Sequence, residues 1–272
     1  MEYRITFCTP ACPAVTGLNG AESGIERTGH LRFAKVFPIY RNPAGTLYGN
    51  MQIAVFQHER TESLGYLEQV FRELGLPFEY IRLYENGEVP RLADATHLVF
   101  MGGPMSVNDE KEYPNLKEEK ELIRRSGKSR QKVLGVCLGA QLIASAFGAP
   151  VYRSMTETGW HELQKVPQDT GVFREFPEKF HVFQLHGETF AIPYGGRLLC
   201  TGDRVKNQGF AVKNCLGLQF HLEMTSEIVR QWSRSLKRSD REKIGRETPR
   251  FLAESNRLCR LVAEDFCREW KK

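Results

Sequence analysis

A single cysteine, Cys137, stands between two glycines in the segment GVCLGAQ, where an apolar run ends and a helix-like run begins. A nucleophile at the tip of a sharp strand-to-helix turn has this pattern, and Gly135 and Gly139 would keep side chains out of the crowded turn. At a helix start, the dipole and the free N–H groups favour a thiolate over a thiol. We therefore predict that Cys137 is a nucleophile. The alternative, a buried cysteine that acts as a small hydrophobe, leaves both glycines unexplained.

A thiolate nucleophile needs a general acid and base, and one histidine has a suitable neighbour. His221 ends the apolar segment LGLQFH, and Glu223 follows two residues later. In extended backbone, both side chains would point the same way. A carboxylate can hold an imidazole in one tautomer and stabilise its charged form. Alone, a histidine at a strand end is commonly a surface residue. Together with the cysteine turn, it predicts a triad of Cys137, His221 and Glu223.

A glycine-rich turn, GGPMSV, follows another apolar segment. The turn at Gly102, Gly103 and Pro104 would leave backbone N–H groups free to point into a cleft at the carboxyl end of a sheet. Such donors, together with the amide of Leu138, can bind the oxyanion of a tetrahedral intermediate. By itself the pattern is only a turn, so its meaning depends on the cysteine nearby.

The elements that must position these residues alternate between strand and helix. Strand patterns fall at 51–58, 78–84, 96–103 and 132–136, and helix patterns fall at 62–75, 113–127 and 138–148. Such alternation predicts an α/β fold with a mostly parallel central sheet and helices on both faces. Further short strands are expected at 181–186, 197–202, 208–214 and 216–221. The C-terminal part from residue 226 is predicted to be helical, with an apolar stripe that packs on the core rather than on a partner.

Composition limits the classes of protein to consider. The chain has 272 residues, of which 41% are apolar, a net charge of +5 and no apolar stretch near eighteen residues. We expect a globular, cytoplasmic protein without a membrane span or a secretory signal. The modest charge gives no reason to expect a nucleic-acid partner. Seven scattered cysteines without a C-x-x-C pair predict reduced thiols and no metal site.

The chain is expected to have three parts. Residues 1–50 are rich in glycine, proline and small polar residues, without sustained periodicity. We interpret them as a disordered leader or as the result of a start codon placed too far upstream. A folded domain is predicted at 51–235, and a helical extension at 236–272.

Four segments together, GGPMSV, GVCLGAQ, QLHGETF and LGLQFHLE, resemble the class I (triad) glutamine amidotransferase domain. The resemblance covers residues 51–235 and is strongest to stand-alone proteins similar to the glutaminase domain of GMP synthase. It implies a flavodoxin-like sheet with the cysteine at its carboxyl edge and no cofactor. It also implies the roles of individual residues: Cys137 as the nucleophile, His221 as the acid and base, Glu223 as its orienting partner, Gly103 and Leu138 as oxyanion donors, and Gly102, Gln141, His186 and Gly187 as contacts of the substrate.

The reaction implied by this resemblance is attack of the thiolate on the side-chain amide of glutamine, release of ammonia and hydrolysis of a γ-glutamyl thioester. One position departs from the family, because Leu222 replaces the usual proline between His221 and Glu223. No segment resembles an ATP-pyrophosphatase domain or a phosphate-binding loop. We therefore expect the ammonia to pass to a synthase partner or to water.

Two alternatives remain open at this stage. The same triad with a roomier pocket would suit a peptidase that acts on γ-glutamyl compounds. A non-catalytic binding module could also have kept the fold.

Overall fold

The computed structural model describes residues 40–41, 47–48, 52–90, 92, 95–167 and 171–268. Within these residues, helices and strands alternate as predicted over the first half. The elements are β1 (Tyr40–Arg41), β2 (Leu47–Tyr48), β3 (Ile53–Gln57), α1 (Tyr66–Glu73), β4 (Phe78–Arg82), α2 (Leu83–Asn86), β5 (His97–Phe100), α3 (Asn115–Ser126), β6 (Lys132–Val136), α4 (Leu138–Ala146), β7 (Val151–Lys165), η1 (Val172–Glu175), β8 (Lys179–Phe190), β9 (Arg197–Thr201), β10 (Gly209–Val212), β11 (Cys215–Leu218), α5 (Ser226–Ser233) and α6 (Arg238–Cys267).

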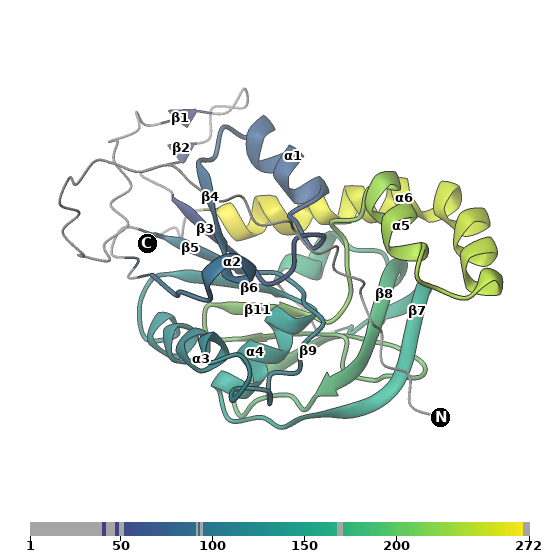
Figure 1. Cartoon of the computed structure of the whole chain (residues 1–272). Helices are drawn as coiled ribbons and strands as arrows, with labels where there is room; N and C mark the ends of the chain where they lie inside the picture. Colours follow the sequence, from purple (N-terminus) through teal and green to yellow (C-terminus); the bar gives the residue numbers. More distant parts are fainter. Residues whose placement is uncertain are drawn as a thin grey trace, which may run out of the picture.

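The described residues contain a nine-stranded sheet in the order β4-β3-β5-β6-β11-β10-β9-β7-β8 (Figure 1). The pairs from β4 to β11 are all parallel. When these five strands are numbered by their appearance in the chain, their order is 2-1-3-4-5, which is the flavodoxin-like order. The predicted fold class is therefore confirmed, and the sheet continues beyond β11 into antiparallel strands.

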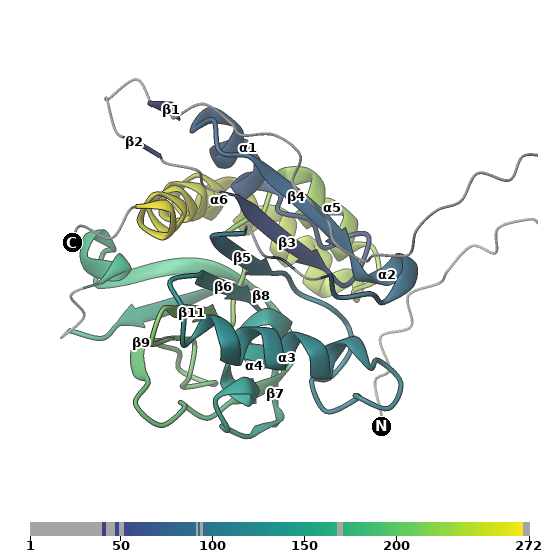
Figure 2. The same cartoon turned by 90° about the vertical axis from the view of Figure 1, so that its left-hand side faces the viewer.

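Helices cover both faces of the parallel strands because alternate strand residues point to opposite sides. Along β3, Ile53 and Val55 join one apolar cluster with helices α1 and α6. Ala54 and Phe56 join a second cluster with α3 and α4. Figure 2 shows the two helix layers on either side of the sheet. Both faces of β3 are buried, which explains why its sequence is a continuous apolar run.

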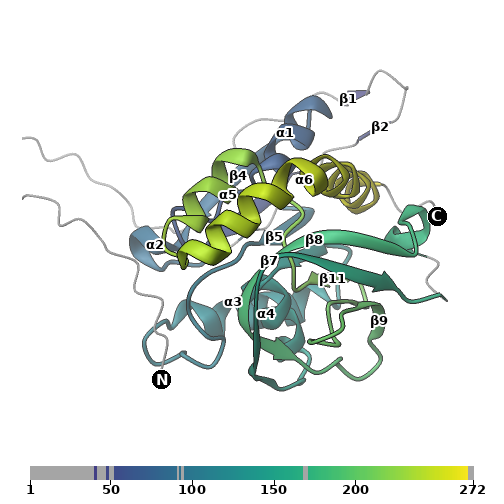
Figure 3. The same ribbon diagram turned by 90° about the vertical axis from the view of Figure 1, so that its right-hand side faces the viewer.

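Strands β7 and β8 form a long antiparallel hairpin that the sequence only partly predicts (Figure 3). A short strand is expected at 181–186, whereas β8 spans twelve residues and its partner β7 spans fifteen. Residues 152–156 of β7 are all exposed. Because neither face of that segment is buried, its sequence has no alternation of polar and apolar residues from which a strand could be predicted.

The C-terminal helices pack against the body of the protein. Leu258, Val262 and Phe266 of α6 are at most 5% exposed and belong to the same apolar cluster as α1. The predicted packing of this apolar stripe on the core is therefore confirmed. The boundary placed at residue 235 stays a prediction.

The interpretation of residues 1–50 as a leader concerns residues that, apart from β1 and β2, lie outside the described part of the chain. No helix among the described residues is long and apolar enough to cross a membrane.

The pairing of β6 with β11 sets the geometry of the site. The two strands are parallel neighbours, with Leu218 opposite Val136, although their sequence positions are far apart. Cys137 and the segment that begins at Gln219 therefore leave the sheet at the same edge. The backbone N–H of Cys137 also donates to the carbonyl of Leu218 at 2.8 Å, which fixes the two chain segments next to each other.

The tight packing of the cysteine turn gives a first prediction. A Cβ at Gly139 would lie 2.0 Å from the carbonyl oxygen of Phe100, whereas a Cβ at Gly245, in helix α6, meets nothing within 4 Å. We expect Gly139→Ala to lower the free energy of unfolding by at least about 2 kcal/mol through overpacking. The matched substitution Gly245→Ala should raise it by up to about 1 kcal/mol. Urea unfolding measures both, and equal effects would contradict this account of the turn.

Candidate functional site

Cys137 occupies the sharp turn that the sequence predicts. It joins β6 to α4 with φ 52° and ψ −105°, a conformation that residues other than glycine rarely adopt. A Cβ at Gly135 would lie 2.3 Å from the carbonyl oxygen of Gly139, so neither flanking position has room for a side chain. Such backbone strain persists only where the surrounding structure fixes it, and it is common at active sites.

The imidazole of His221 pairs with the carboxylate of Glu223. The distance from Nδ1 to Oε1 is 2.6 Å, and both residues are at most 3% exposed. The sequence places His221 at the end of a strand in extended backbone. In the structure, β11 ends at Leu218, and His221 forms an isolated bridge with Phe183 of β8. The pair forms without the proline usual in the family, and Leu222 between them packs into the core.

The protonation of His221 depends on its two neighbours. Burial by itself would lower the pKa of the imidazole, but the charge of Glu223 and the interaction with the thiol of Cys137 outweigh burial. The pKa of His221 is therefore raised well above its usual value. Trp232 of α5 packs edge-on against the ring, with 4.8 Å between ring centroids, and so limits the movement of the imidazole.

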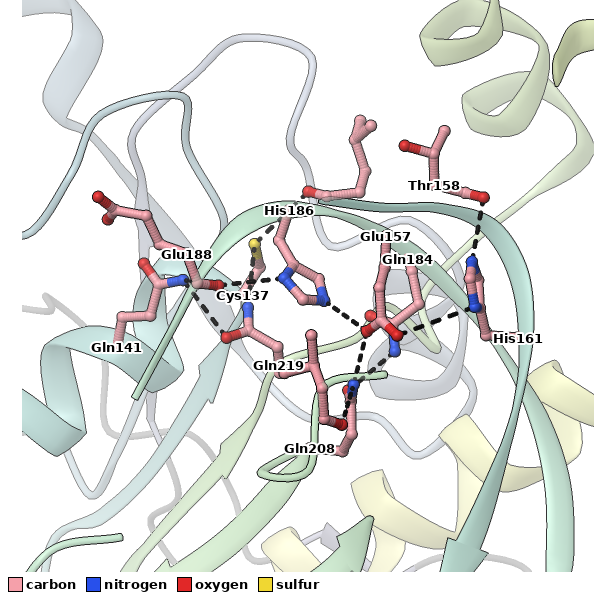
Figure 4. Close-up of polar contacts among 12 residues, drawn as sticks. Cys137, Gln141, Glu157, Thr158, His161, Gln184, His186, Glu188, Gln208 and Gln219 are labelled. Atoms are coloured by element: carbon pink, nitrogen blue, oxygen red, sulfur yellow. Dashed lines mark hydrogen bonds and ion pairs between the residues drawn. The ribbon is translucent and has the colours of Figure 1, made fainter. Parts of the chain in front are cut away.

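Two further groups face the thiol (Figure 4). The backbone carbonyl of Leu185 lies 4.0 Å from Sγ, and Nε2 of Gln219 lies 3.8 Å from it. Gln219 is fully buried and immediately follows β11. Gln219 could not be predicted from the sequence, because a glutamine in an apolar segment carries no signal of its own.

The glycine-rich turn lies beside the start of α4. A Cβ at Gly103 would come within 2.8 Å of Cδ2 of Leu138, so the turn packs against the first residue of this helix. As the first residue of a helix, Leu138 has no intrahelical partner for its N–H. No described residue accepts a hydrogen bond from the N–H of Gly103. Both donors are therefore free to bind an anion.

A buried pair supports the glycine-rich turn from beneath. His58, directly after β3, contacts Glu119 of α3 with 2.7 Å between Nε2 and Oε2, and Asn115 donates to the other carboxylate oxygen at 2.9 Å. The Cβ of His58 would lie 3.0 Å from a Cβ on Gly103. Although burial lowers it, the pKa of His58 is raised overall by Glu119. This pair was not predicted, because its members come from separate elements.

Two of the predicted substrate contacts, Gln141 and His186, lie near Cys137, and their side chains are engaged within the protein (Figure 4). Gln141 donates to the carbonyl of Glu188 at 3.2 Å and to the Gln219 side chain at 3.4 Å. His186 faces the Glu188 carbonyl through Nδ1 at 3.0 Å. Gly187 is exposed on β8. Gln141 thereby ties α4 to β8, whereas His186 contacts a carbonyl of its own strand.

A polar network extends from His186 into the interior. Its Nε2 lies 3.2 Å from Oε2 of Glu157 on β7, which also accepts a hydrogen bond from Gln208 at 2.7 Å. Gln184 in turn donates to Gln208 at 2.8 Å. Burial would raise the pKa of Glu157, but His186 and Gln208 hold it below its usual value. The network keeps the two strands of the hairpin at a fixed position beside the thiol.

Glu62, in the loop between β3 and α1, is a further carboxylate at the site, which the sequence pattern did not predict. Its Oε2 lies 1.9 Å from the point that a Cβ on Gly102 would occupy, and Cε1 of His221 lies 3.3 Å from the same point. Only glycine at position 102 leaves room for this carboxylate. Burial raises the pKa of Glu62 to about 7. The one available signal was that the loop follows the carboxyl end of a parallel strand.

No group of three or more histidine, cysteine or acidic side chains in the described part of the chain could hold a metal ion. The arrangement can nevertheless do covalent chemistry. A thiol, an imidazole with a carboxylate behind it and two free backbone donors meet at one edge of the sheet. This set can form and break an acyl bond to sulfur.

Comparison with known proteins agrees with this geometry. The family model for glutamine amidotransferase class-I matches residues 64–231, which is more than half of the chain. The putative glutamine amidotransferase-like protein YfeJ of Salmonella typhimurium is 28% identical over 187 residues, covering 66% of this chain and 78% of that protein. A Picrophilus torridus protein named as one subunit of glutamine-hydrolyzing GMP synthase is 28% identical over 158 residues, covering 57% and 80% respectively.

A solved structure is similar over most of the chain. The crystal structure of a glutamine amidotransferase from Thermotoga maritima matches with a TM-score of 0.73 and 31% identity, covering 81% of this chain and 99% of the other.

The half-buried carboxylate of Glu62 gives a prediction about stability. Its pKa in the folded protein, about 7, exceeds the reference value of 4.5. The folded state therefore binds more protons between these two values, and stability should fall as the pH rises through them. Glu62→Gln removes this loss. The free energy of unfolding of the variant should therefore exceed that of wild type by about 1–3 kcal/mol at pH 8 and by much less at pH 5. Urea unfolding at both pH values measures the difference, and a gap independent of pH would contradict the prediction.

Proposed function

Because the chain belongs to the class-I glutamine amidotransferase family, we propose that it hydrolyses the side-chain amide of glutamine through Cys137, His221 and Glu223. The observation that carries this proposal is the buried imidazole of His221, placed between a carboxylate at 2.6 Å and the thiol of the strained turn. An imidazole held in this way can take and return a proton next to the sulfur.

The first half of the reaction forms a covalent intermediate. The sulfur of Cys137 attacks the amide carbon, and the negative charge moves to the carbonyl oxygen. The N–H groups of Gly103 and Leu138 bind that oxygen. The carbon–nitrogen bond then breaks, and His221 gives its proton to the nitrogen, which leaves as ammonia. The products of this step are a γ-glutamyl thioester and a neutral imidazole.

Water completes the second half. His221 removes a proton from a water molecule, whose oxygen attacks the thioester carbon. The carbon–sulfur bond breaks, the sulfur leaves as thiolate, and glutamate is released with the imidazole protonated again. Glu223 holds Nδ1 throughout, so that Nε2 remains directed at the reacting atoms.

We further propose that the ammonia is used by a synthase partner. This rests on the similarity to a protein named as one subunit of GMP synthase. The γ-glutamyl peptidase alternative uses the same triad, and the two activities are separated by comparing release of ammonia from glutamine with release of glutamate from γ-glutamyl dipeptides. Faster cleavage of the dipeptides would replace the amidotransferase proposal.

Removal of the nucleophile is the direct test. We expect Cys137→Ser to lower kcat/KM for glutamine by at least about a thousandfold, because the covalent step is lost. An electrophilic glutamine analogue should add once to wild type, and intact mass should show no adduct with the variant. Cys215→Ala, a buried cysteine on β11, is the matched control and should keep activity and labelling. An unlabelled wild-type protein would favour a non-catalytic module.

The carboxylate behind the imidazole gives a pH prediction. Since Glu223 is a cause of the raised pKa of His221, Glu223→Gln should lower that pKa. The imidazolium would then lose its proton at lower pH, so the basic limb of the kcat/KM profile should move toward lower pH. We also expect kcat to fall by about tenfold to a hundredfold. A basic limb that stays in place would show that Glu223 does not stabilise the charged imidazole.

A further inference from the structure

The loop that carries Glu62 is held at three places, by α5, by the segment of Glu223 and by the end of β3. Trp232 donates through Nε1 to the carbonyl of Thr61 at 3.2 Å. The N–H of Tyr66 donates to the carbonyl of Glu223 at 2.7 Å. The side chain of Gln57 donates to the carbonyls of residues 59 and 60, both at 3.1 Å. Trp232 also packs against His221, so the loop and the catalytic imidazole share one support.

The carboxylate of Glu62 has no hydrogen bond or ion pair to any described residue, although the side chain is half-buried. It lies against Gly102 and close to Cε1 of His221. The charged groups around it are His58 at the end of β3, Glu59 on its own loop, and His221 and Glu223 after β11. Leaving a carboxylate partly buried without a partner costs stability, so its retention calls for another reason.

We propose that Glu62 selects the leaving amine. It favours glutamine itself and γ-glutamyl amides of positively charged amines, and it disfavours γ-glutamyl amino acids. This inference rests on the proposed function, because it concerns the substrate of the same site.

The argument follows from where the nitrogen must lie. His221 gives its proton to the leaving nitrogen, so that nitrogen sits next to the imidazole. Cε1, which is bonded to the Nε2 that gives the proton, lies 3.3 Å from the Cβ position of Gly102, and Oε2 of Glu62 lies 1.9 Å from that position. A substituent on the Gly102 side of the nitrogen would therefore meet Glu62. In a γ-glutamyl amino acid, a carboxylate is attached only two bonds from this nitrogen. Two like charges a few ångströms apart in a half-buried site repel strongly enough to lower kcat/KM by about tenfold to a hundredfold.

The primary amide of glutamine avoids this repulsion. Its second N–H can donate to the carboxylate of Glu62, which accepts no side-chain hydrogen bond and forms no ion pair within the described part of the chain. A cationic substituent would gain the opposite interaction from the same charge. Glu62 therefore bears on the choice between glutaminase and γ-glutamyl peptidase, which the triad itself does not decide.

The test compares three γ-glutamyl amides whose leaving amines are ethylamine, glycine and ethylenediamine, which are neutral, anionic and cationic. At pH 8, wild type should cleave the glycine compound at least about tenfold less efficiently than the ethylamide, and Glu62→Gln should remove most of this difference. The preference of wild type for the ethylenediamine compound over the ethylamide should also fall in Glu62→Gln. Glu85→Gln, which removes an exposed carboxylate on α2, should leave all three ratios unchanged.

The pH dependence identifies the group responsible. Since the pKa of Glu62 is about 7, discrimination against the glycine compound should weaken in wild type from pH 8 to pH 6, as the carboxylate is protonated. In Glu62→Gln the ratio should be constant over this range. A ratio that still changes with pH in the variant would assign the effect to His58, Glu59, His221 or Glu223 and overturn the proposal.

A readout without turnover separates this inference from the proposed function. Alkylation of Cys137 by iodoacetate, iodoacetamide and 2-bromoethylamine is followed by intact mass in wild type and Glu62→Gln. The alkylation rate with iodoacetate, divided by the rate with iodoacetamide, should rise at least about threefold in the variant. The rate with 2-bromoethylamine, divided by the rate with iodoacetamide, should fall. If no amide is hydrolysed but these ratios change, the proposed function fails and the effect of Glu62 stands. Unchanged ratios overturn the inference even in an active enzyme.

Discussion

The parallel pairing of β6 with β11 is the constraint on which the site depends. It brings Leu218 opposite Val136, so that the chain leaves both strands at one edge of the sheet. Without this pairing, the thiol and the imidazole would have no reason to meet. The pairing also explains why the turn at Cys137 can be strained, because its N–H is held by the carbonyl of Leu218. Backbone hydrogen bonds of a buried sheet hold this unfavourable conformation in place.

The residues proposed to be catalytic are supported by elements that lie outside the cysteine turn. Trp232 of α5 contacts the ring of His221 and fixes the loop of Glu62, while the β7–β8 hairpin supplies a carbonyl that faces the thiol. The C-terminal helices thus do more than cover the sheet. Through Trp232, α5 also limits how the imidazole and the nearby loop can move, which is the precision that the proposed catalysis requires.

The two histidine–glutamate pairs at the edge of the sheet have different positions and therefore different consequences. His221 and Glu223 sit beside the thiol, where a proton can be exchanged with a substrate. His58 and Glu119 are completely buried beneath the glycine-rich turn and can only support it. Residue types alone do not separate these cases. Burial does not separate them either, because all four residues are at most 3% exposed. The interaction of His221 with the thiol of Cys137 does, and this is a property of the folded chain.

The sequence by itself determined the family and the fold class, and it pointed to the residues of the proposed chemistry. Cys137 between glycines, His221 with Glu223, and the alternation of apolar segments are local patterns, and local sterics and periodicity are properties that a sequence carries directly. The tertiary structure decided what depends on distant segments meeting. It placed Glu62 against Gly102, turned Gln141 and His186 into contacts between elements, and formed β7 from residues without alternation. These features arise from the packing of elements far apart in the chain, which no short stretch of sequence specifies.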